Sequence, residues 1–144
     1  MDNHDEQVIV PALERATHLV GLWVERSFAD LRLTQAEAHV LASLARHSPS
    51  SINGLHHHFG HKRSTLTSLL DRLESRGWLR RGSHPTSRRL VMVHLTNAGR
   101  PVADRVHAAL HALEARILAR ASSEDISAFE RVIQSLEEEL THDR

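Results

Sequence analysis

The chain has 144 residues, of which 40% are hydrophobic and 25% charged, a composition that fits one globular domain or one module with accessory helices. No cysteine is present, which excludes a disulfide, a thiolate metal site and a thiol redox switch. No apolar run reaches the roughly 18 residues of a membrane span, and the opening MDNHDEQ is unlike a secretory signal. We therefore expect a cytoplasmic protein. The formal net charge of the chain is zero.

The first part of the chain predicts two helices. Residues 11–31 have apolar residues at helical spacing with charged residues between them, and Pro11 suits a first helical turn. Thr34 and Glu37 form a capping box for a second helix, which residues 47–50 end. The apolar residues of the first helix are Leu13, Leu19, Val20, Trp23 and Phe28, and those of the second are Val40, Leu41 and Leu44.

Two further helices are predicted around a glycine turn. Ser51 can cap a short helix, Gly60 makes the turn, and a longer helix over residues 62–76 stops at Gly77. The apolar residues of the short helix are Ile52, Leu55 and Phe59, and those of the longer one are Leu66, Leu69, Leu70 and Leu73.

After these helices the hydrophobic period changes from helical to alternating, which predicts a β-hairpin. Its strands are residues 78–81 and 90–95, and residues 82–87 have the composition of a turn. Thr96 can cap a helix that runs to about residue 121, and a last helix covers residues 124–140.

The first helix and the last two carry more apolar surface than one small domain can bury. We therefore predict that they pair with a second copy of the chain, as a homodimer. Residues 1–32 and 97–144 are the predicted dimerisation region. The predicted fold class is mainly α with a small β-hairpin wing.

The short helix, the turn at Gly60 and the helix after it have the order of a helix-turn-helix motif. Residues 62–68 are small, polar and positive, as the major groove of DNA requires, and Arg63 can reach guanine or a phosphate. The hairpin carries Arg88 and Arg89, whose guanidinium groups suit a narrow minor groove. The predicted DNA-contacting residues are Lys62, Arg63, Ser64, Thr65, Thr67, Ser68, Arg72, Arg88 and Arg89.

The distribution of charge agrees with this interpretation. Residues 62–89 hold eight of the 18 basic residues and two of the 18 acidic ones, so the segment carries +6 and the rest of the chain −6. A basic cluster of this kind attracts phosphate, although a solvated basic surface is the alternative. Residues 33–96 are thus the predicted winged helix-turn-helix domain, which binds double-stranded DNA.

At these positions the sequence resembles the MarR family of bacterial regulators. The matching segments are LT at 33–34, RSTLT at 63–67, LDRLE at 70–74, GWLRR at 77–81 and LTNAGR at 95–100. The resemblance implies a ligand-responsive transcriptional regulator, more often a repressor, that binds a roughly palindromic operator as an obligate dimer. It also implies a cleft for a small-molecule effector between the dimerisation and DNA-binding parts, and we name Trp23 and His18 as candidates for it.

Three positions depart from the family's pattern. Ser87 stands where the family often has an aspartate that braces the groove-reading arginine, so either Arg88 or Arg89 can take that role. His56 replaces a small residue and His61 an apolar one, which indicates unusual packing in the motif or a polar partner.

Thirteen histidines raise the question of a metal site. His107 and His111 are four residues apart on one predicted helix, and His39 and His18 lie on helices that could approach them. A zinc-responsive regulator of the same fold is therefore an alternative, although these side chains are more simply surface or interface histidines. Trp23 has a similar alternative, a place in the core or the dimer interface.

Two other classes of function have less support in the sequence. The chain has no HExxH motif, no glycine-rich phosphate loop and no cysteine nucleophile, so an enzyme is not predicted. A winged-helix module that binds only proteins is the other alternative, but such a surface has no need for eight clustered cations. Of the adjacent Arg80 and Arg81, one can contact phosphate and the other can face the protein, because neighbours on a strand point opposite ways.

Overall fold

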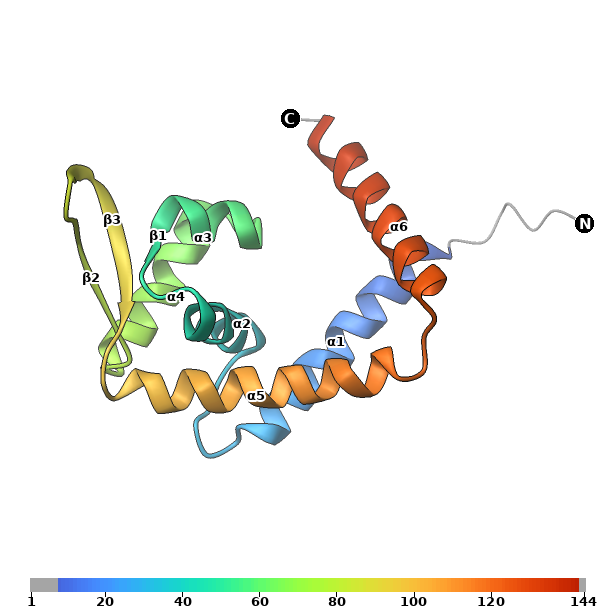
Figure 1. Cartoon of the computed structure of the whole chain (residues 1–144), viewed down its shortest axis with the longest axis horizontal. Coiled ribbons are helices and arrows are strands. Elements are labelled where there is room, and N and C mark those ends of the chain that lie inside the picture. The colour runs from blue at the N-terminus through green and yellow to red at the C-terminus, as the bar shows by residue number, and fades with distance from the viewer. Residues whose placement is uncertain (1–7, 143–144) are drawn as a thin grey trace, which may run out of the picture. The chain divides into compact units, whose positions relative to one another are not determined.

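A computed structural model describes residues 8–142 of the chain (Figure 1). The elements are α1 (Ile9–Ser27), α2 (Gln35–Arg46), β1 (Ser50–Ser51), α3 (Ile52–Phe59), α4 (Arg63–Ser75), β2 (Leu79–His84), β3 (Ser87–Leu95), α5 (Gly99–Leu118) and α6 (Ser123–His142). This order confirms the predicted fold class, mainly α with a β-hairpin wing.

The predicted helix caps are present. The Thr34 hydroxyl accepts a hydrogen bond from the Glu37 backbone N–H at 3.2 Å, and the Glu37 carboxylate accepts one from the Thr34 N–H at 3.1 Å. The Ser51 hydroxyl likewise accepts from the Gly54 N–H at 2.9 Å. These bonds satisfy backbone donors that the first turn of a helix leaves free, and they set where α2 and α3 begin.

The first predicted helix is too long at its C-terminal end. α1 stops at Ser27, and a turn over residues 28–32 replaces the last predicted helical residues. Arg32 in that turn has a φ of 49°, a left-handed conformation that a helix cannot contain. The last two helices differ less: α5 begins at Gly99, and α6 continues to His142.

The predicted turn of the hairpin is also too long. β2 extends to His84 and β3 begins at Ser87, so only Pro85 and Thr86 lie between the strands. Antiparallel pairing with β3 carries residues of turn-forming type into the ladder, with an irregularity next to His84. The result is a longer, narrower wing than the sequence predicted, which Figure 1 shows beside the helices of this part of the chain.

β1 was not predicted at all. Its two residues, Ser50 and Ser51, pair antiparallel with Val93 and Met92 of β3 and complete a sheet of order β1-β3-β2. So short a strand has no hydrophobic alternation of its own, and its partner lies more than 40 residues away. It joins the start of α3 to the base of the wing.

Two glycines connect the wing to its neighbours. Gly77 has a φ of 76°, which lets the chain leave α4 and enter β2. A Cβ atom on Gly99 would lie 2.0 Å from the Trp78 carbonyl oxygen, so only glycine fits at the start of α5. Thr96 strengthens this junction, because its hydroxyl donates to the Gly77 carbonyl at 2.6 Å and its N–H to the Trp78 carbonyl at 3.0 Å.

The chain separates into two compact units, residues 8–107 and residues 108–142 of the described part. Every buried hydrophobic side chain of the described residues belongs to the first unit. The core consists of Val24, Phe28, Leu33, Ala38, Val40, Leu41, Leu44, Leu55, Leu66, Leu69, Leu70, Leu73, Leu79, Val93, Ala103 and Val106. The predicted apolar stripes of the second and fourth helices therefore face one core.

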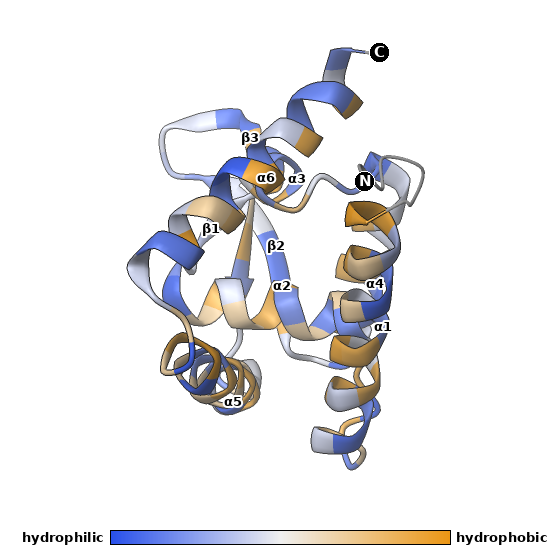
Figure 2. Cartoon of the chain, turned by 90° about the vertical axis from the view of Figure 1, so that its right-hand side faces the viewer, coloured by the Kyte–Doolittle hydropathy of each residue, from blue (hydrophilic) through white to orange (hydrophobic). Residues whose placement is uncertain are grey.

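The second unit has no buried residue among residues 108–142. Phe129 of α6 is 61% exposed and Leu140 is 63% exposed, although both lie at the helical spacing of an apolar face. α1 in the first unit has a similar set of exposed apolar side chains, and Figure 2 shows hydrophobic residues recurring along it. Exposed apolar side chains that recur along a helix face are typical of surfaces that bind another protein chain.

Candidate nucleic-acid interface

The N-terminal half of α4 presents a polar face above an apolar one. Leu66, Leu69, Leu70 and Leu73 are buried against the core and hold the helix in place. The predicted contact residues Lys62, Arg63, Ser64, Thr65, Thr67 and Ser68 are all exposed. No side chain caps the start of α4, so its free backbone N–H groups and the helix dipole face outward beside two cations.

Thr67 shows how this polar face is organised. Its hydroxyl donates to the Arg63 carbonyl at 2.9 Å, so the remaining lone pairs point outward as acceptors. Arg63 itself extends from the first turn of α4, where a recognition helix meets base edges. The arrangement can offer both donors and acceptors to a major groove.

The end of α3 and the turn after it lead into α4. Gly60 ends α3 in a left-handed conformation, with a φ of 66°. His61 lies at an angle of 30° to Phe59, with ring centroids 6.2 Å apart, which accounts for a histidine where an apolar residue is usual. Burial lowers the pKa of His39 on α2, and the neighbouring His61 lowers the pKa of His39 further. His61 thus has an aromatic neighbour, and the unusual packing that the sequence indicated stays a prediction.

The wing carries two further cations next to its turn. Arg88 and Arg89 are exposed on β3, and within residues 8–142 neither forms an ion pair. They point to opposite faces of the strand, because side chains alternate along it. His84 stabilises the turn between β2 and β3: its Nδ1 accepts a hydrogen bond from the Thr86 N–H at 3.1 Å. This bond restricts the tip that presents Arg88.

Three other basic side chains of the 62–89 segment have partners within the protein. The Arg72 Nε donates to the Glu37 carboxylate at 2.8 Å. The Arg81 Nε donates to Glu74 at 2.8 Å, and the same guanidinium also pairs with Asp71, so the pKa of Arg81 is raised. Arg76 lies over the Trp78 ring, 3.9 Å from its centroid. Arg72 binds Glu37 of α2 through its Nε while its side chain stays 53% exposed, so its role as a DNA contact stays a prediction.

Five cations of this segment remain available for phosphate or bases. They enter no ion pair, side-chain hydrogen bond or ring contact within residues 8–142, and they are Lys62, Arg63, Arg80, Arg88 and Arg89. Arg80 and Arg81 thus divide as the alternation of a strand requires, with Arg81 toward α4. Charge clustering indicated the segment but could not identify which cations the carboxylates of α2 and α4 would bind.

Sequence reasoning missed a second role of Glu37. The capping box accounted for one carboxylate oxygen, while the other binds Arg72, 35 residues along the chain. It also missed Asp30, which accepts bonds from two Arg105 nitrogens at 2.7 and 3.0 Å and so joins the loop after α1 to α5. Arg105 lowers the pKa of Asp30 through this pair. Neither partnership has a local sequence signal.

The candidate effector and metal residues lie on several elements. Trp23 is half-buried on α1 and meets Phe28 edge-on, with centroids 6.1 Å apart, while His18 is exposed on the same helix. His39 lies on α2, and His107 and His111 lie on α5. In the described part of the chain no three histidine, aspartate or glutamate side chains are grouped to hold a metal ion.

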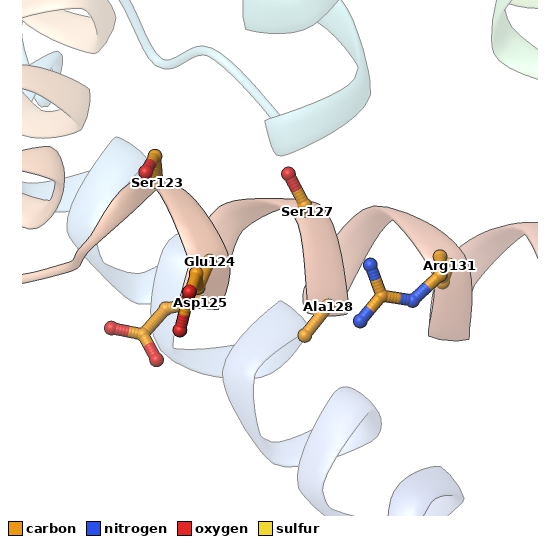
Figure 3. Close-up of a pocket in the computed structure, with 6 residues that line it drawn as sticks. All are labelled: Ser123, Glu124, Asp125, Ser127, Ala128 and Arg131. Atoms are coloured by element: carbon orange, nitrogen blue, oxygen red, sulfur yellow. The ribbon is translucent and has the colours of Figure 1, made fainter.

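A shallow surface hollow lies elsewhere. Figure 3 shows its lining residues, which all belong to the first half of α6 and do not include Trp23 or His18. They are Ser123, Glu124, Asp125, Ser127, Ala128 and Arg131. A hollow along one exposed helix face does not enclose a ligand, so the effector cleft stays a prediction.

The fold and this surface define a winged helix-turn-helix DNA-binding protein. Residues 33–91 match the MarR family model. The chain is 32% identical to the HTH-type transcriptional regulator PecS of Dickeya dadantii over 147 residues, covering 97% of this chain and 86% of that protein. It is 29% identical to the HTH-type transcriptional repressor Rv2887 of Mycobacterium tuberculosis, covering 90% of this chain and 85% of that protein.

Solved structures agree on the fold. The S. aureus MepR–DNA complex superimposes with a TM-score of 0.79 at 16% identity, covering 94% of this chain and 99% of that one. A mutant MarR from E. coli superimposes with a TM-score of 0.62 at 22% identity, covering 91% and 98%. The chain belongs to the MarR family, and it is a DNA-binding transcriptional regulator. None of its helices between residues 8 and 142 has the length and hydropathy to cross a bilayer.

Proposed function

We propose that the protein is a repressor that binds a pseudo-palindromic operator as a homodimer and leaves it when a small molecule binds. The observation that carries the proposal is the set of five cations without internal partners, at the start of α4 and on the wing. Lys62 and Arg63 suit a major groove, and Arg88 or Arg89 suits the adjacent minor groove.

The exposed apolar faces of α1, α5 and α6 support the homodimer. Ile117, Phe129 and Leu140 are each more than half exposed in the single chain, and a second copy would remove such side chains from water. A symmetric dimer presents two recognition helices, and both can dock only when the half-sites lie about one helical turn apart. The operator is then a pseudo-palindrome.

The names of the relatives favour repression: one is a transcriptional regulator and another a transcriptional repressor. A ligand that binds the released conformation better than the DNA-bound one would lower operator affinity. We place this ligand near Trp23 and His18, expect no catalytic activity from the protein, and expect it in the cytoplasm with its DNA.

The test begins with the operator. A duplex is selected from a randomised pool by the purified protein, and its affinity is compared with that of a scrambled duplex by fluorescence anisotropy at several salt concentrations. We expect the selected duplex to bind roughly a thousandfold or more tightly, with log affinity falling linearly with log salt. Equal affinity for both duplexes would contradict the proposal and favour the protein-interaction module.

Arg63→Ala sharpens the same test. If Arg63 contacts a base, the substitution weakens binding of the selected duplex by roughly 1–3 kcal/mol and relaxes the preference at one base pair of each half-site. The control is Arg120→Ala, which removes an exposed cation outside the 62–89 segment. An unchanged preference over the scrambled duplex would exclude Arg63 from base reading.

The effector class is resolved by adding zinc and then a chelator to the bound complex. If zinc does not alter binding to the duplex, the effector is to be sought among small organic molecules. Binding that depends on zinc selects the alternative regulator, and His107→Ala and His111→Ala are then the first variants to compare.

A further inference from the structure

Glu37 is the one buried charged residue among residues 8–142, with 4% of its surface exposed. Its two oxygens serve different parts of the domain. One accepts the Thr34 N–H at 3.1 Å and caps α2, while the other accepts the Arg72 Nε at 2.8 Å and so contacts α4. A helix cap needs only one oxygen and works at an exposed position. Burial of a whole carboxylate has a large desolvation cost that the cap alone does not explain.

Arg72 lies on the polar side of the recognition helix, not in its apolar stripe. Ser68 and Ser64 precede it by four and eight residues, so the three side chains lie along one side of α4. The bond from Arg72 to Glu37 therefore restricts rotation of α4 about its axis, and it does so on the side that carries two predicted contact residues. Leu66 and Leu70 hold the opposite side through the core.

A second pair of contacts holds α4 at a different place. Asp71 and Glu74 both bind Arg81 of β2 and so join α4 to the base of the wing. The two sets of ion pairs connect the recognition helix to α2 and to the wing, respectively. Loss of the contact with Glu37 would leave α4 held by its buried leucines and by the contacts with Arg81 alone.

We propose that Glu37 is a positioning residue for sequence recognition, which acts through Arg72 to hold α4 at the rotation where its first turns read bases. The inference rests on the proposed recognition role of α4. The proposal also assigns Arg72 a different role. Its guanidinium binds Glu37 and so positions α4, and it is not one of the phosphate contacts that set the salt dependence of DNA binding.

Glu37→Gln separates this idea from simple electrostatics, because the two make opposite predictions. The glutamine amide oxygen can still accept the Thr34 N–H, but the ion pair with Arg72 is lost. If charge alone mattered, removal of an anion beside the interface would free Arg72 and strengthen binding to every duplex. If Glu37 positions α4, affinity for the selected duplex falls relative to the scrambled one.

The experiment measures the ratio of the two affinities for the full-length protein and its variants. We expect Glu37→Gln to lower the ratio about tenfold, mainly through the selected duplex. Glu25→Gln, which removes the same charge from an exposed site on α1, leaves the ratio unchanged. A variant that fails to fold would lose both affinities together, and circular dichroism melting identifies that case.

Arg72→Gln is the second variant, and its salt dependence decides its role. A positioning role predicts the same fall in the ratio with an unchanged salt slope. The double variant should be no worse than the worse single one, since both remove the same ion pair. The alternative result is a slope of log affinity against log salt that is smaller by about one per subunit, with the ratio of the two affinities unchanged. That result would make Arg72 a phosphate contact and overturn the inference.

The wild-type protein provides the remaining control. If it does not distinguish the selected duplex from the scrambled one, the proposed function fails and the inference about Glu37 fails with it. If it does distinguish them and Glu37→Gln distinguishes them equally well or better, this inference alone is wrong.

Discussion

The two compact units differ in where they keep their hydrophobic side chains. Residues 8–107 bury all sixteen of the core side chains, while residues 108–142 bury none and leave Phe129 and Leu140 mostly exposed. Internal ion pairs also lie in the first unit, as at Glu37 and Arg72. The difference indicates that the first unit can satisfy its own packing, whereas the second is a surface that requires another chain.

The largest effect is expected from a matched pair of leucine substitutions, one in each unit. Leu73→Ala leaves a cavity in the first unit and should lower the free energy of unfolding by about 2–5 kcal/mol at every protein concentration. Leu140→Ala removes an exposed side chain from α6, so its cost should shrink as concentration rises and mass action restores the dimer. Urea unfolding at several concentrations measures both. Equal, concentration-independent losses would contradict the comparison.

A charge on the exposed face of α6 should separate assembly from folding. We expect Phe129→Glu to weaken dimerisation by about 2 kcal/mol or more, since a carboxylate would be buried where an aromatic side chain packs. Helical content should be retained. Sedimentation equilibrium measures the dimer, and Ser135→Glu, which adds the same charge on another side of α6, is the control. A stable Phe129→Glu dimer would show that another surface joins the subunits.

The smallest expected effect is a pH dependence inside the first unit. Burial, and then His61, lowers the pKa of His39, so the folded chain binds that proton less well than the unfolded chain. Stability is then complete above the unfolded pKa of about 6.5 and falls as the pH drops below it. His39→Gln should reduce this loss, as measured by urea unfolding across that range.

His57→Gln is the matched control, since it removes an exposed histidine from α3. An identical pH profile for His39→Gln and the wild type would show that His39 does not contribute to acid sensitivity. A change in the pH profile of the control alone would assign the acid sensitivity to the exposed histidines.

Local chemistry explains why most elements could be predicted. The capping box at Thr34, the cap at Ser51 and the stop at Gly77 all act within a few residues, and each is found where the sequence placed it. β1 was missed for the opposite reason: two serines become a strand only because Val93 and Met92 lie beside them.

The same contrast holds for the DNA-binding surface. Charge clustering and the resemblance placed it on α4 and the wing, because residue type alone makes a segment basic. Which arginines lack an ion-pair partner depends on carboxylates that folding brings close: Glu37 binds Arg72, and Asp71 and Glu74 bind Arg81. The effector residues Trp23 and His18 remain predictions, because a cleft is formed by several elements together.

The sequence by itself determined the order of the helices, their caps, the wing and the family, because periodicity, hydrogen-bonding side chains and backbone preferences operate between near neighbours. Only the tertiary structure decided which cations have carboxylate partners and which carboxylate binds the recognition helix. The physical reason is that an ion pair such as Glu37–Arg72 forms across 35 residues of chain, when packing of the leucine core brings α2 and α4 together and excludes water from the carboxylate.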